Sequence, residues 1–292
     1  MNKIAASELI LNPDGSVYHL NLQPENIATN IIFVGDQNRV PKIAAHFESI
    51  EFETQKREFR TITGTYKGTK ISVISTGIGP DNIDIVMNEL DALVNIDLKS
   101  RTVKTAHTKL NIVRIGTSGS LQSDIPVDSF VLAQYGLGFD GLLHSYDCEE
   151  ILEAEMEDAF IKHTNWNPRK SRPYLVKGSE LLIQKLKSDN VFVGVTATAG
   201  GFYGPQGRVL RLALEDPSLN SKIDNFEFDG YKVTNLEMET SAIYGLAKLL
   251  GHEACSMNAI IANRANGTFS EDPYKPVEDL IVYTLNKLIS SV

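Results

Sequence analysis

The chain has 292 residues, of which 42% are hydrophobic and 22% charged. This composition can bury a large core and excludes an intrinsically disordered chain. The formal net charge of −9 argues against a general binder of nucleic acids or anionic membranes, because both kinds of partner reward a basic surface. A small anionic ligand is still allowed, because one pocket of an acidic protein can be positive.

The sequence predicts a cytoplasmic protein. Its two cysteines, Cys148 and Cys255, are too few for a disulfide framework or a cysteine-based metal site, and both are expected to be reduced thiols. The first residues, MNKIAASELILNPDG, show no long apolar stretch followed by a cleavage site. No run approaches the roughly eighteen uninterrupted apolar residues that a membrane-spanning helix needs.

In chain order, a polar arm over residues 1–17 is followed by alternating strands and helices. Short apolar or alternating runs predict strands over 30–35, 58–75 (a hairpin turning at Lys67-Gly68), 111–120, 128–135, 191–200 and 254–265. Apolar residues at three- and four-residue spacing predict helices over 40–47, 79–95, 150–163, 178–188, 242–250 and 277–289.

This alternation predicts an α/β layered fold with a largely parallel sheet. No internal repeat, low-complexity tract or Pro/Ser-rich linker interrupts the sequence, so residues 1–292 are expected to form one domain. The polar, basic segment 96–109 is interpreted as a surface connection, with an anion-handling or oligomer-contacting loop as the alternative. Ligands of such sheets bind beyond the carboxyl ends of the strands, which here carry GDQNR, RIGTSG, TAGGFYGPQGR, NLEMET and NRANG.

The stretch NLEMETS (235–241) places two acids where a helix should begin. Residues two apart on a helix point to different sides, so Glu237 and Glu239 are not expected to form the facing pair of a glycosidase. Thr234 with Glu237 matches the S/T-x-x-E capping box, which favours a capping role for Glu237. Glu239 is the better candidate for binding two neighbouring hydroxyls, and Met238 is either core or an apolar wall beneath a sugar.

Three arginines lie in segments that could bind phosphate. The sequence has no GxxxxGK[ST], and no GxGxxG follows a strand, so the main signals for triphosphate and dinucleotide sites are missing. Instead, Arg39 follows the turn GDQN, Arg114 precedes GTSG, and Arg57 lies in KREF. Guanidinium groups and the backbone N–H groups of tight turns bind phosphate oxygens. Taken singly, each arginine is better explained as an ordinary surface or salt-bridge residue, but two of the three lie at strand ends beside glycine turns, which chance alone explains less well.

The glycine-rich loop GGFYGPQGR can complement a heterocyclic ring. Phe202 offers a flat face, Gln206 carries an acceptor and donors on one amide, and Arg208 carries only donors. Together they suit a ring edge that presents two carbonyls and an N–H. The alternative is a flexible loop with two exposed polar side chains.

Taken in order, the motifs GDxxR, KREF, STGIG, RIGTSG, FYxxQxR, NxEMET and NR resemble the uridine phosphorylase branch of the nucleoside phosphorylase family. The similarity runs from Tyr18-His19 to the carboxyl terminus, and EMET together with FYxxQxR is its specific part. The resemblance implies a three-layer α/β/α fold with a central mixed sheet, built as dimers and often as hexamers. It also implies that phosphate is a co-substrate and that no cofactor is needed.

The resemblance assigns a phosphate site. Gly35, Arg39, Arg114 and Thr117 match the positions that hold phosphate in the family, and Arg57 matches an arginine that the neighbouring subunit contributes. The chain departs from the family where Gln37 replaces the proline of GDPxR and where Tyr-Gly-Pro-Gln-Gly-Arg replaces Tyr-Pro-Gly-Gln-Glu-Arg. These changes keep the arginines and the glutamine.

The resemblance also assigns ribose, cation and base sites. Glu239 and Met238 match the ribose-binding pair, and His19 matches a histidine that reaches across the dimer interface to the 5′-hydroxyl. Glu58 matches a glutamate that lines a monovalent-cation site, of the potassium kind, between subunits in some members. The pyrimidine pocket and an arginine behind it near O4 are matched by Phe202, Gln206, Arg208 and Arg264.

The implied reaction is reversible phosphorolysis of uridine, with deoxyuridine also considered, to uracil and ribose 1-phosphate in pyrimidine salvage. Arg114, Arg208 and Glu239 are the residues expected to act in catalysis, and no protein nucleophile is required. Purine-specific relatives carry an aspartate where this chain reads Asn263-Arg264-Ala265-Asn266. The alternatives are a hydrolytic purine nucleosidase of the same fold and a non-catalytic nucleoside-binding oligomer.

Overall fold

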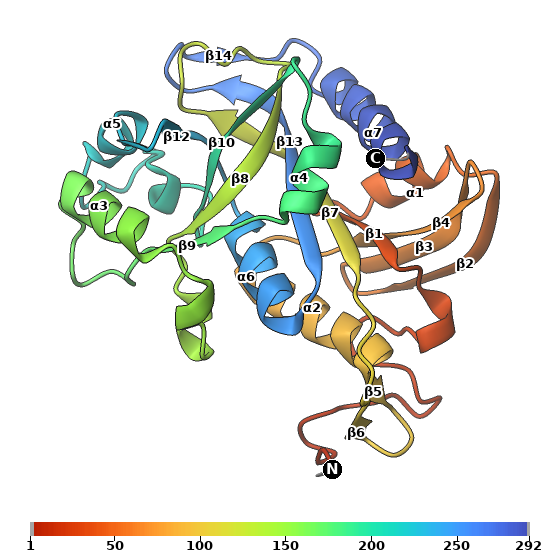
Figure 1. Cartoon of the computed structure of the whole chain (residues 1–292). Coiled ribbons are helices and arrows are strands. Elements are labelled where there is room, and N and C mark those ends of the chain that lie inside the picture. Colours follow the sequence, from red (N-terminus) through yellow and green to blue (C-terminus); the bar gives the residue numbers. More distant parts are fainter. Residues whose placement is uncertain (1–2, 291–292) are drawn as a thin grey trace.

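The computed structural model describes residues 3–290, and a large mixed sheet runs through its centre (Figure 1). The spatial order of its strands is β11-β12-β10-β8-β13-β7-β1-β4-β3-β2, with β9 beside β8 and β14 beside β13. The strands are β1 Asn30–Val34, β2 Ser49–Lys56, β3 Phe59–Tyr66, β4 Thr69–Ser75, β7 Asn111–Ser120, β8 Phe130–Gly138, β9 Tyr174–Lys177, β10 Val191–Thr198, β11 Glu227–Phe228, β12 Tyr231–Glu237, β13 Glu253–Asn263 and β14 Thr268–Phe269.

Helices cover both faces of the sheet. Along β1, Ile31 and Phe33 pack in one apolar cluster with α2 and α6, whereas Ile32 and Val34 pack in another with α1, α4 and α7. Successive side chains of a strand point to opposite faces, so a strand that is apolar throughout is covered on both. This confirms the three-layer arrangement. The helices are α1 Arg39–Ala44, α2 Pro80–Asn95, α3 Ala154–Thr164, α4 Glu180–Leu186, α5 Leu219–Asp224, α6 Thr240–Leu250 and α7 Tyr274–Ile289.

The sheet is mixed, as the resemblance implied, and the expectation of a largely parallel sheet was too simple. β4, β1, β7 and β13 form one parallel group, and β8, β10 and β12 form a second. The two groups meet antiparallel, both at β13 with β8 and at β12 with β7. The second of these pairings, Asn235 with Ser120 and Leu236 with Gly119, folds β12 round to β7. Strand ends from both groups are thereby brought together.

Most predicted elements are present, with changes at their ends. The strand predicted over 128–135 runs on to Gly138, and the helix predicted over 150–163 begins at Ala154, after a short 3-10 turn at Glu149–Ile151. The predicted hairpin turns at Lys67-Gly68 between β3 and β4. β2, β9 and the short β11 and β14 were not predicted, and the strand that ends in NLEMET was expected without bounds and is β12. β2 is exposed or half-buried along its whole length. Its sequence therefore carries little of the apolar signal that marks a strand.

The segment 96–109 lies at the surface, as predicted, where β5 (Ile96–Asp97) and β6 (Thr102–Val103) form a small separate hairpin. The amino-terminal arm packs against it, because the backbone N–H of Ile4 donates to the carbonyl of Arg101 over 2.8 Å, and Figure 1 shows the two segments together. The alternative roles of this segment stay predictions. None of the helices in residues 3–290 combines the length and apolar character needed to span a membrane.

Candidate active site

A cavity of about 760 Å³ lies at the carboxyl ends of β1, β4, β7, β12 and β13. This is the place where a sheet with parallel strands binds ligands. Three of the predicted site residues, His19, Arg57 and Arg264, are not among the residues that line it. The predicted residues that do line the cavity are Gly35, Arg39, Glu58, Arg114, Thr117, Phe202, Gln206, Arg208, Met238 and Glu239.

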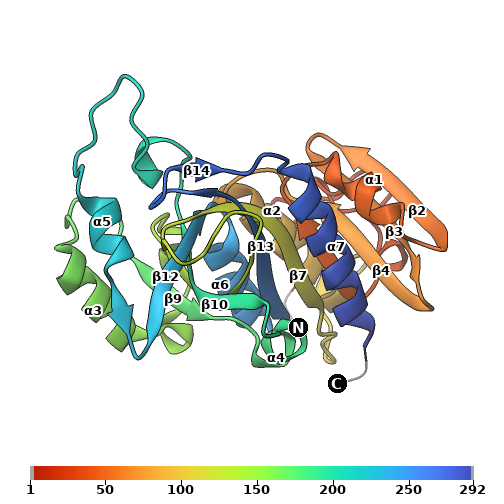
Figure 2. The same ribbon diagram turned by 90° about the horizontal axis from the view of Figure 1, so that it is seen from above.

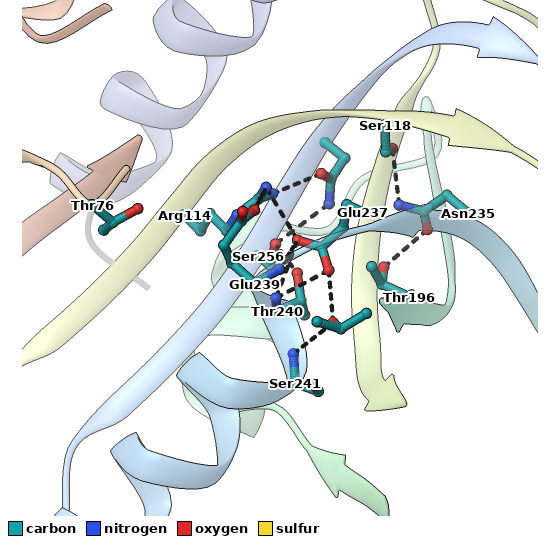
Figure 3. Close-up of polar contacts among 12 residues, drawn as sticks. Thr76, Arg114, Ser118, Thr196, Asn235, Glu237, Glu239, Thr240, Ser241 and Ser256 are labelled. Atoms are coloured by element: carbon teal, nitrogen blue, oxygen red, sulfur yellow. Dashed lines mark hydrogen bonds and ion pairs between the residues drawn. The ribbon is translucent and has the colours of Figure 1, made fainter. Parts of the chain in front are cut away.

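One buried guanidinium is shared by two carboxylates at the centre of the cavity (Figure 3). A terminal nitrogen of Arg114 lies 2.5 Å from Glu239 and 3.1 Å from Glu237. The other terminal nitrogen donates to the side-chain oxygen of Asn258 on β13 over 2.8 Å. Gly116 makes this placement possible, because a Cβ there would stand 1.9 Å from the guanidinium. The arginine is therefore fixed by strands β7, β12 and β13 before any ligand arrives.

The electrostatic balance of this cluster is set by burial and by two negative charges on one positive charge. Burial raises the pKa of Glu239, and Glu237 adds to that effect against the attraction of Arg114. Burial would lower the pKa of Arg114, but the charges of Glu237 and Glu239 outweigh burial and raise it. The cluster thus holds two negative charges against one positive charge, and Arg39 brings a second positive charge to the same cavity.

The two acids of the EMET motif do not lie on one helix. Glu237 ends β12, and Glu239 is the N-cap residue of α6, which begins at Thr240. The predicted capping box is wrong, because Thr234 lies inside β12 and its hydroxyl donates to Val195 of the neighbouring strand. The expectation that the acids diverge is also wrong, since helical spacing does not apply across a strand end and both carboxylates reach Arg114.

Glu237 nevertheless supports the start of α6. Its carboxylate accepts hydrogen bonds from the backbone N–H groups of Glu239, over 3.0 Å, and Thr240. It also accepts from the hydroxyl of Thr198 at the end of β10 over 2.7 Å. A carboxylate is favourable at the amino terminus of a helix, where backbone N–H groups lack partners. The residue was correctly expected to stabilise this helix with its carboxylate, although from a position before the helix and not from the third position of its first turn.

Glu239 is held from two sides. The backbone N–H of Gly79, at the start of α2, donates to one carboxylate oxygen over 2.9 Å, and Arg114 donates to the other. Gly79 has a φ of 96°, a backbone conformation that L side chains rarely adopt. The remaining lone pairs of this carboxylate are available for ligand hydroxyls.

A second guanidinium lies at the end of the cavity formed by the turn after β1. Arg39 donates to the backbone carbonyl of Ile115 over 3.1 Å. Burial lowers the pKa of Arg39, and repulsion from Arg114 adds to this effect. Thr117 on β7 and Gly35 at the end of β1 line the same cavity. Two positive groups that repel each other in a half-closed cavity favour the binding of an anion.

The glycine-rich loop forms the other end of the cavity. A guanidinium nitrogen of Arg208 donates to the amide oxygen of Gln206 and to the carbonyl of Phe202, each over 2.6 Å. The guanidinium carbon of Arg208 lies 3.9 Å from the centroid of the Phe202 ring. Arg264 lies behind the loop and donates to the backbone carbonyl of Gln206 over 2.5 Å. One face of the Phe202 ring is thus covered by Arg208, while half of the side chain stays exposed, so its role in stacking stays a prediction.

His19 and Arg57 lie together outside the cavity. Arg57 is exposed at the tip between β2 and β3, where its φ is 54°. Its neighbour Lys56 donates to the backbone carbonyl of Tyr18, and the ring of His19 lies 6.4 Å from that of Phe59. These two predicted site residues therefore share one surface of the chain and do not reach its own cavity.

The phosphorylase superfamily is the family whose model matches this chain, over residues 29–289. The chain belongs to this superfamily of nucleoside phosphorylases. Members of the family act on nucleosides with phosphate. The fold agrees with this membership, since the central mixed sheet lies between two layers of helices.

Individual relatives of this nucleoside phosphorylase differ in the nucleoside they are named for. A uridine phosphorylase from Thermococcus kodakarensis is 28% identical over 93% of this chain and 86% of that protein. A purine nucleoside phosphorylase of the DeoD type from Listeria monocytogenes is also 28% identical, over 93% of this chain and 98% of its own length.

Among solved structures, a nucleoside phosphorylase from Trypanosoma brucei that shows uridine phosphorylase activity superposes with a TM-score of 0.87. It is 29% identical and covers 97% of this chain and 100% of its own. A uridine phosphorylase from the oomycete Phytophthora capsici superposes with a TM-score of 0.70 at 22% identity, covering all of both chains, which shows the shared fold.

Two asparagines at or next to the cavity were not predicted from the sequence. Asn258 anchors Arg114 from inside β13, and Asn82 on α2 lines the cavity next to Gly77. An asparagine in the middle of the apolar run ACSMNAII is the one signal that could have singled out Asn258, because a buried amide needs a partner. For Asn82 no motif offered a signal.

The cation site expected at Glu58 stays a prediction. Glu58 lines the cavity, and no group of three or more His, Cys, Asp or Glu residues in the part of the chain described here could hold a metal ion. A monovalent cation bound between subunits would need further oxygen ligands from a second chain. Both cysteines, Cys148 and Cys255, are free and buried.

Proposed function

We propose that this chain is a uridine phosphorylase, which converts uridine and phosphate reversibly into uracil and ribose 1-phosphate. The observation that carries the proposal is the arrangement of Gln206 and Arg208 at one end of the cavity. Because Arg208 donates to the amide oxygen of Gln206, the amide is held with that oxygen towards Arg208. The reverse orientation would place amide N–H groups against guanidinium N–H groups, two sets of donors facing each other.

This orientation produces a row of donor, acceptor and donor. The amide nitrogen of Gln206 is the first donor, its oxygen has a second lone pair for an N–H group, and Arg208 is the second donor. Uracil presents the complementary row, with O2, N3–H and O4. Cytosine presents an unprotonated N3 and an amino group instead, so an acceptor meets an acceptor and a donor meets a donor.

The base end of the cavity also lacks the acid that a purine substrate would use. The cavity-lining carboxylates of the described residues are Asp36, Glu58, Glu237 and Glu239, and none belongs to the glycine-rich loop or to the end of β13. Asn263, at that strand end, donates its amide hydrogens to the backbone carbonyls of Gln122 and Ile125. It holds a loop, and a carboxamide is in any case not an acid that could protonate a base.

The remaining roles follow from the same cavity. Arg39, Thr117, Gly35 and the free donors of Arg114 would hold phosphate. Glu239 would accept hydrogen bonds from the ribose hydroxyls, above the apolar side chain of Met238. Arg114 was expected to bind phosphate, and we propose that it also holds Glu239. One of its terminal nitrogens already contacts both carboxylates.

In the proposed reaction the C1′–N1 bond lengthens before phosphate attacks C1′ from the opposite face. Negative charge collects on the departing uracil, and Arg208 with Gln206 would stabilise it by about 3–4 kcal/mol per donor, as oxyanion donors do in other enzymes. Holding phosphate against C1′ would supply much of the remaining acceleration, because it removes the entropy cost of bringing two reactants together.

The proposal includes a dimer, or three dimers as a hexamer. Arg57 and His19 lie on one surface and do not reach the cavity of their own chain. On a second copy of the chain they could complete the phosphate and 5′-hydroxyl ends of its site. The reaction would serve pyrimidine salvage in the cytoplasm, where free thiols such as Cys148 and Cys255 stay reduced.

A panel of nucleosides tests the proposal. Uridine, deoxyuridine, thymidine, cytidine and inosine are each mixed with the protein, with and without phosphate, and cleavage is followed by ultraviolet absorbance. We expect phosphate-dependent cleavage of uridine and at least about a hundredfold lower kcat/KM for cytidine, since two mismatched hydrogen bonds leave polar groups unpaired.

Two results of the panel would contradict the proposal. The purine relative at equal identity makes inosine the important comparison, and a higher kcat/KM for inosine than for uridine would assign the site to purines. Turnover that is undiminished without phosphate would instead indicate a hydrolase.

A further inference from the structure

The side chain of Glu89, inside helix α2, is bound to the segment that carries His19. Its carboxylate accepts the backbone N–H of His19, over 2.9 and 3.0 Å to its two oxygens, and the backbone N–H of Leu20 over 2.8 Å. The Nδ1 atom of the His19 ring lies 2.6 Å from the same carboxylate. One acid from the middle of a helix thus contacts three donors of a single short segment.

This contact determines which nitrogen of the His19 ring carries hydrogen. An ionised carboxylate only accepts hydrogen bonds, so Nδ1 at 2.6 Å must be the protonated nitrogen. In the neutral ring Nε2 is then left as a hydrogen-bond acceptor. The His19 side chain is 25% exposed and that of Glu89 15%. The pair is therefore shielded enough for the hydrogen bond to hold one tautomer.

The same segment is braced from a second direction. Lys56, at the end of β2, donates to the backbone carbonyl of Tyr18 and, over 3.0 Å, to the side-chain oxygen of Asn12. Its amino group also lies 4.4 Å from the centroid of the Tyr18 ring. The backbone next to His19 is therefore fixed by Lys56, and the orientation of the ring by Glu89.

We propose that Glu89 is a positioning residue for substrate recognition: it holds His19 in the tautomer whose Nε2 accepts a hydrogen bond from the 5′-hydroxyl of a nucleoside. The inference rests on the proposed function, in which His19 serves the cavity of a neighbouring subunit. It adds that the 5′-hydroxyl is the donor in this contact. Nucleosides without a 5′ O–H group would then lose the contribution of His19 entirely.

The substitution Glu89→Gln tests this directly. Three groups donate to Glu89: the backbone N–H groups of His19 and Leu20 and the Nδ1 atom of the His19 ring. A backbone N–H can only donate, whereas Nδ1 can lose its hydrogen to Nε2 and become an acceptor. The amide N–H of the new glutamine is therefore expected to donate to Nδ1 of His19, which moves the ring hydrogen to Nε2. The recognition of the 5′-hydroxyl then changes while the size of the side chain does not.

The kinetic measurement is the ratio of kcat/KM for uridine to that for 5′-deoxyuridine. We expect a ratio of about ten in the wild-type protein, the size of one hydrogen bond of ordinary strength. In Glu89→Gln the hydroxyl would have to turn and accept from Nε2–H, so the ratio is expected to fall below the wild-type ratio, towards that of His19→Ala, with 5′-deoxyuridine turnover changed by less than about threefold. Glu25→Gln removes an exposed acid near the same segment and should keep the wild-type ratio.

Nitrogen NMR of protein labelled in its six histidines provides a second measurement that needs no activity. Wild-type His19 should show a protonated Nδ1 and an unprotonated Nε2, and Glu89→Gln should show the opposite tautomer. The resonance of His19 is assigned by its loss in His19→Ala.

Several outcomes would overturn the inference. A wild-type ratio retained in Glu89→Gln, or an equal loss for both substrates, would show that Glu89 only stabilises the fold. A wild-type ring protonated at Nε2, alone or together with Nδ1, would exclude the acceptor nitrogen that the inference requires. If the wild-type protein cleaves no uridine, the proposed function fails, and the NMR result alone decides whether Glu89 sets the tautomer of His19.

Discussion

The guanidinium of Arg114 contacts two buried carboxylates and one amide. This arrangement explains why the cavity is formed without a ligand. Removing charged groups from water is costly, and a buried charge left without its partner destabilises a protein by about 3–5 kcal/mol. Arg114, Glu237 and Glu239 are therefore mutually dependent. Their geometry is fixed by Asn258 and by the backbone N–H of Gly79, so the acid that would bind ribose does not need to be reoriented by the substrate.

Part of this residue-scale arrangement was available from the sequence. Glu239, Gln206 and Arg208 stand in motifs that the family resemblance marks. Asn258 could not be found in that way, because its contact with Arg114 joins two residues that are 144 positions apart. That Glu237 and Glu239 share Arg114 was not predicted either. Helical spacing had been assumed for the two acids, but Glu237 ends a strand and Glu239 precedes a helix.

Replacing Arg208 with alanine gives a prediction at this scale. The variant loses a donor to the base and the group that orients Gln206, so kcat/KM for uridine should fall by about a hundred- to a thousandfold. The KM for phosphate should change by less than about threefold, because phosphate would bind at the other end of the cavity. Initial rates at varied uridine and phosphate measure both. Arg211→Ala removes an exposed arginine of the same loop and should have little effect; a similar loss in both variants would contradict the assigned role.

At the scale of elements, the placement of α6 decides where Glu239 lies. The helix packs on β8 at a glycine, since a Cβ at Gly136 would stand 2.8 Å from the Cα of Ser241 and 3.0 Å from its backbone nitrogen. The helix starts at Thr240 because Glu237, at the end of β12, accepts its first backbone N–H groups. The apolar period of the helix was readable in the sequence. Its first residue was not, because a Thr and a Glu three apart also fit the end of a strand.

The substitution Gly136→Ala should therefore affect both stability and activity. The added methyl group meets backbone atoms, which cannot rotate away as a side chain can, and should reduce the free energy of unfolding by about 1–3 kcal/mol. Because α6 must shift, Glu239 moves with it and kcat/KM should fall. Urea unfolding followed by circular dichroism measures the first effect.

Gly200→Ala is the matched control for this change. Gly200 has no atom nearer than 3.8 Å to an added Cβ, so the same substitution should alter stability by less than about 0.5 kcal/mol. An unchanged unfolding midpoint in Gly136→Ala would show that α6 accommodates the methyl group, and the link between this glycine and the site would be lost.

For the whole molecule, the cavity results from the way the sheet turns back on itself. β12 pairs with β10 on one side and with β7 on the other, and Asn235 on β12 links Ser118 and Thr196 of those two strands, each over 2.9 Å (Figure 3). The presence of most strands along the chain depends on the local sequence and can be predicted from it. The pairing of β12 with β7 joins residues that are more than a hundred positions apart in the sequence. No pattern within either strand predicts it.

One exposed apolar segment of the chain suits contact with another molecule. Figure 2 shows the segment before α5 projecting from the body of the protein, and Val209, Leu210 and Leu212 in it are more than half exposed. Large exposed apolar side chains are typical of surfaces that meet another molecule. Together with the position of Arg57 and His19 outside the cavity, they favour the proposal that two chains complete each other's sites.

Mixing two inactive variants tests this proposal. Arg57→Ala removes the arginine that one chain would lend to its neighbour, whereas Glu239→Ala removes an acid of the chain's own cavity. In a mixed dimer one cavity lacks both residues and the other has both. Co-refolding equal amounts should therefore restore about a quarter of wild-type activity, since about half of random dimers are mixed and each has one intact site of two. Activity no higher than that of the separate variants, in a mixture shown by tagged subunits to contain mixed dimers, would place Arg57 outside the neighbouring site.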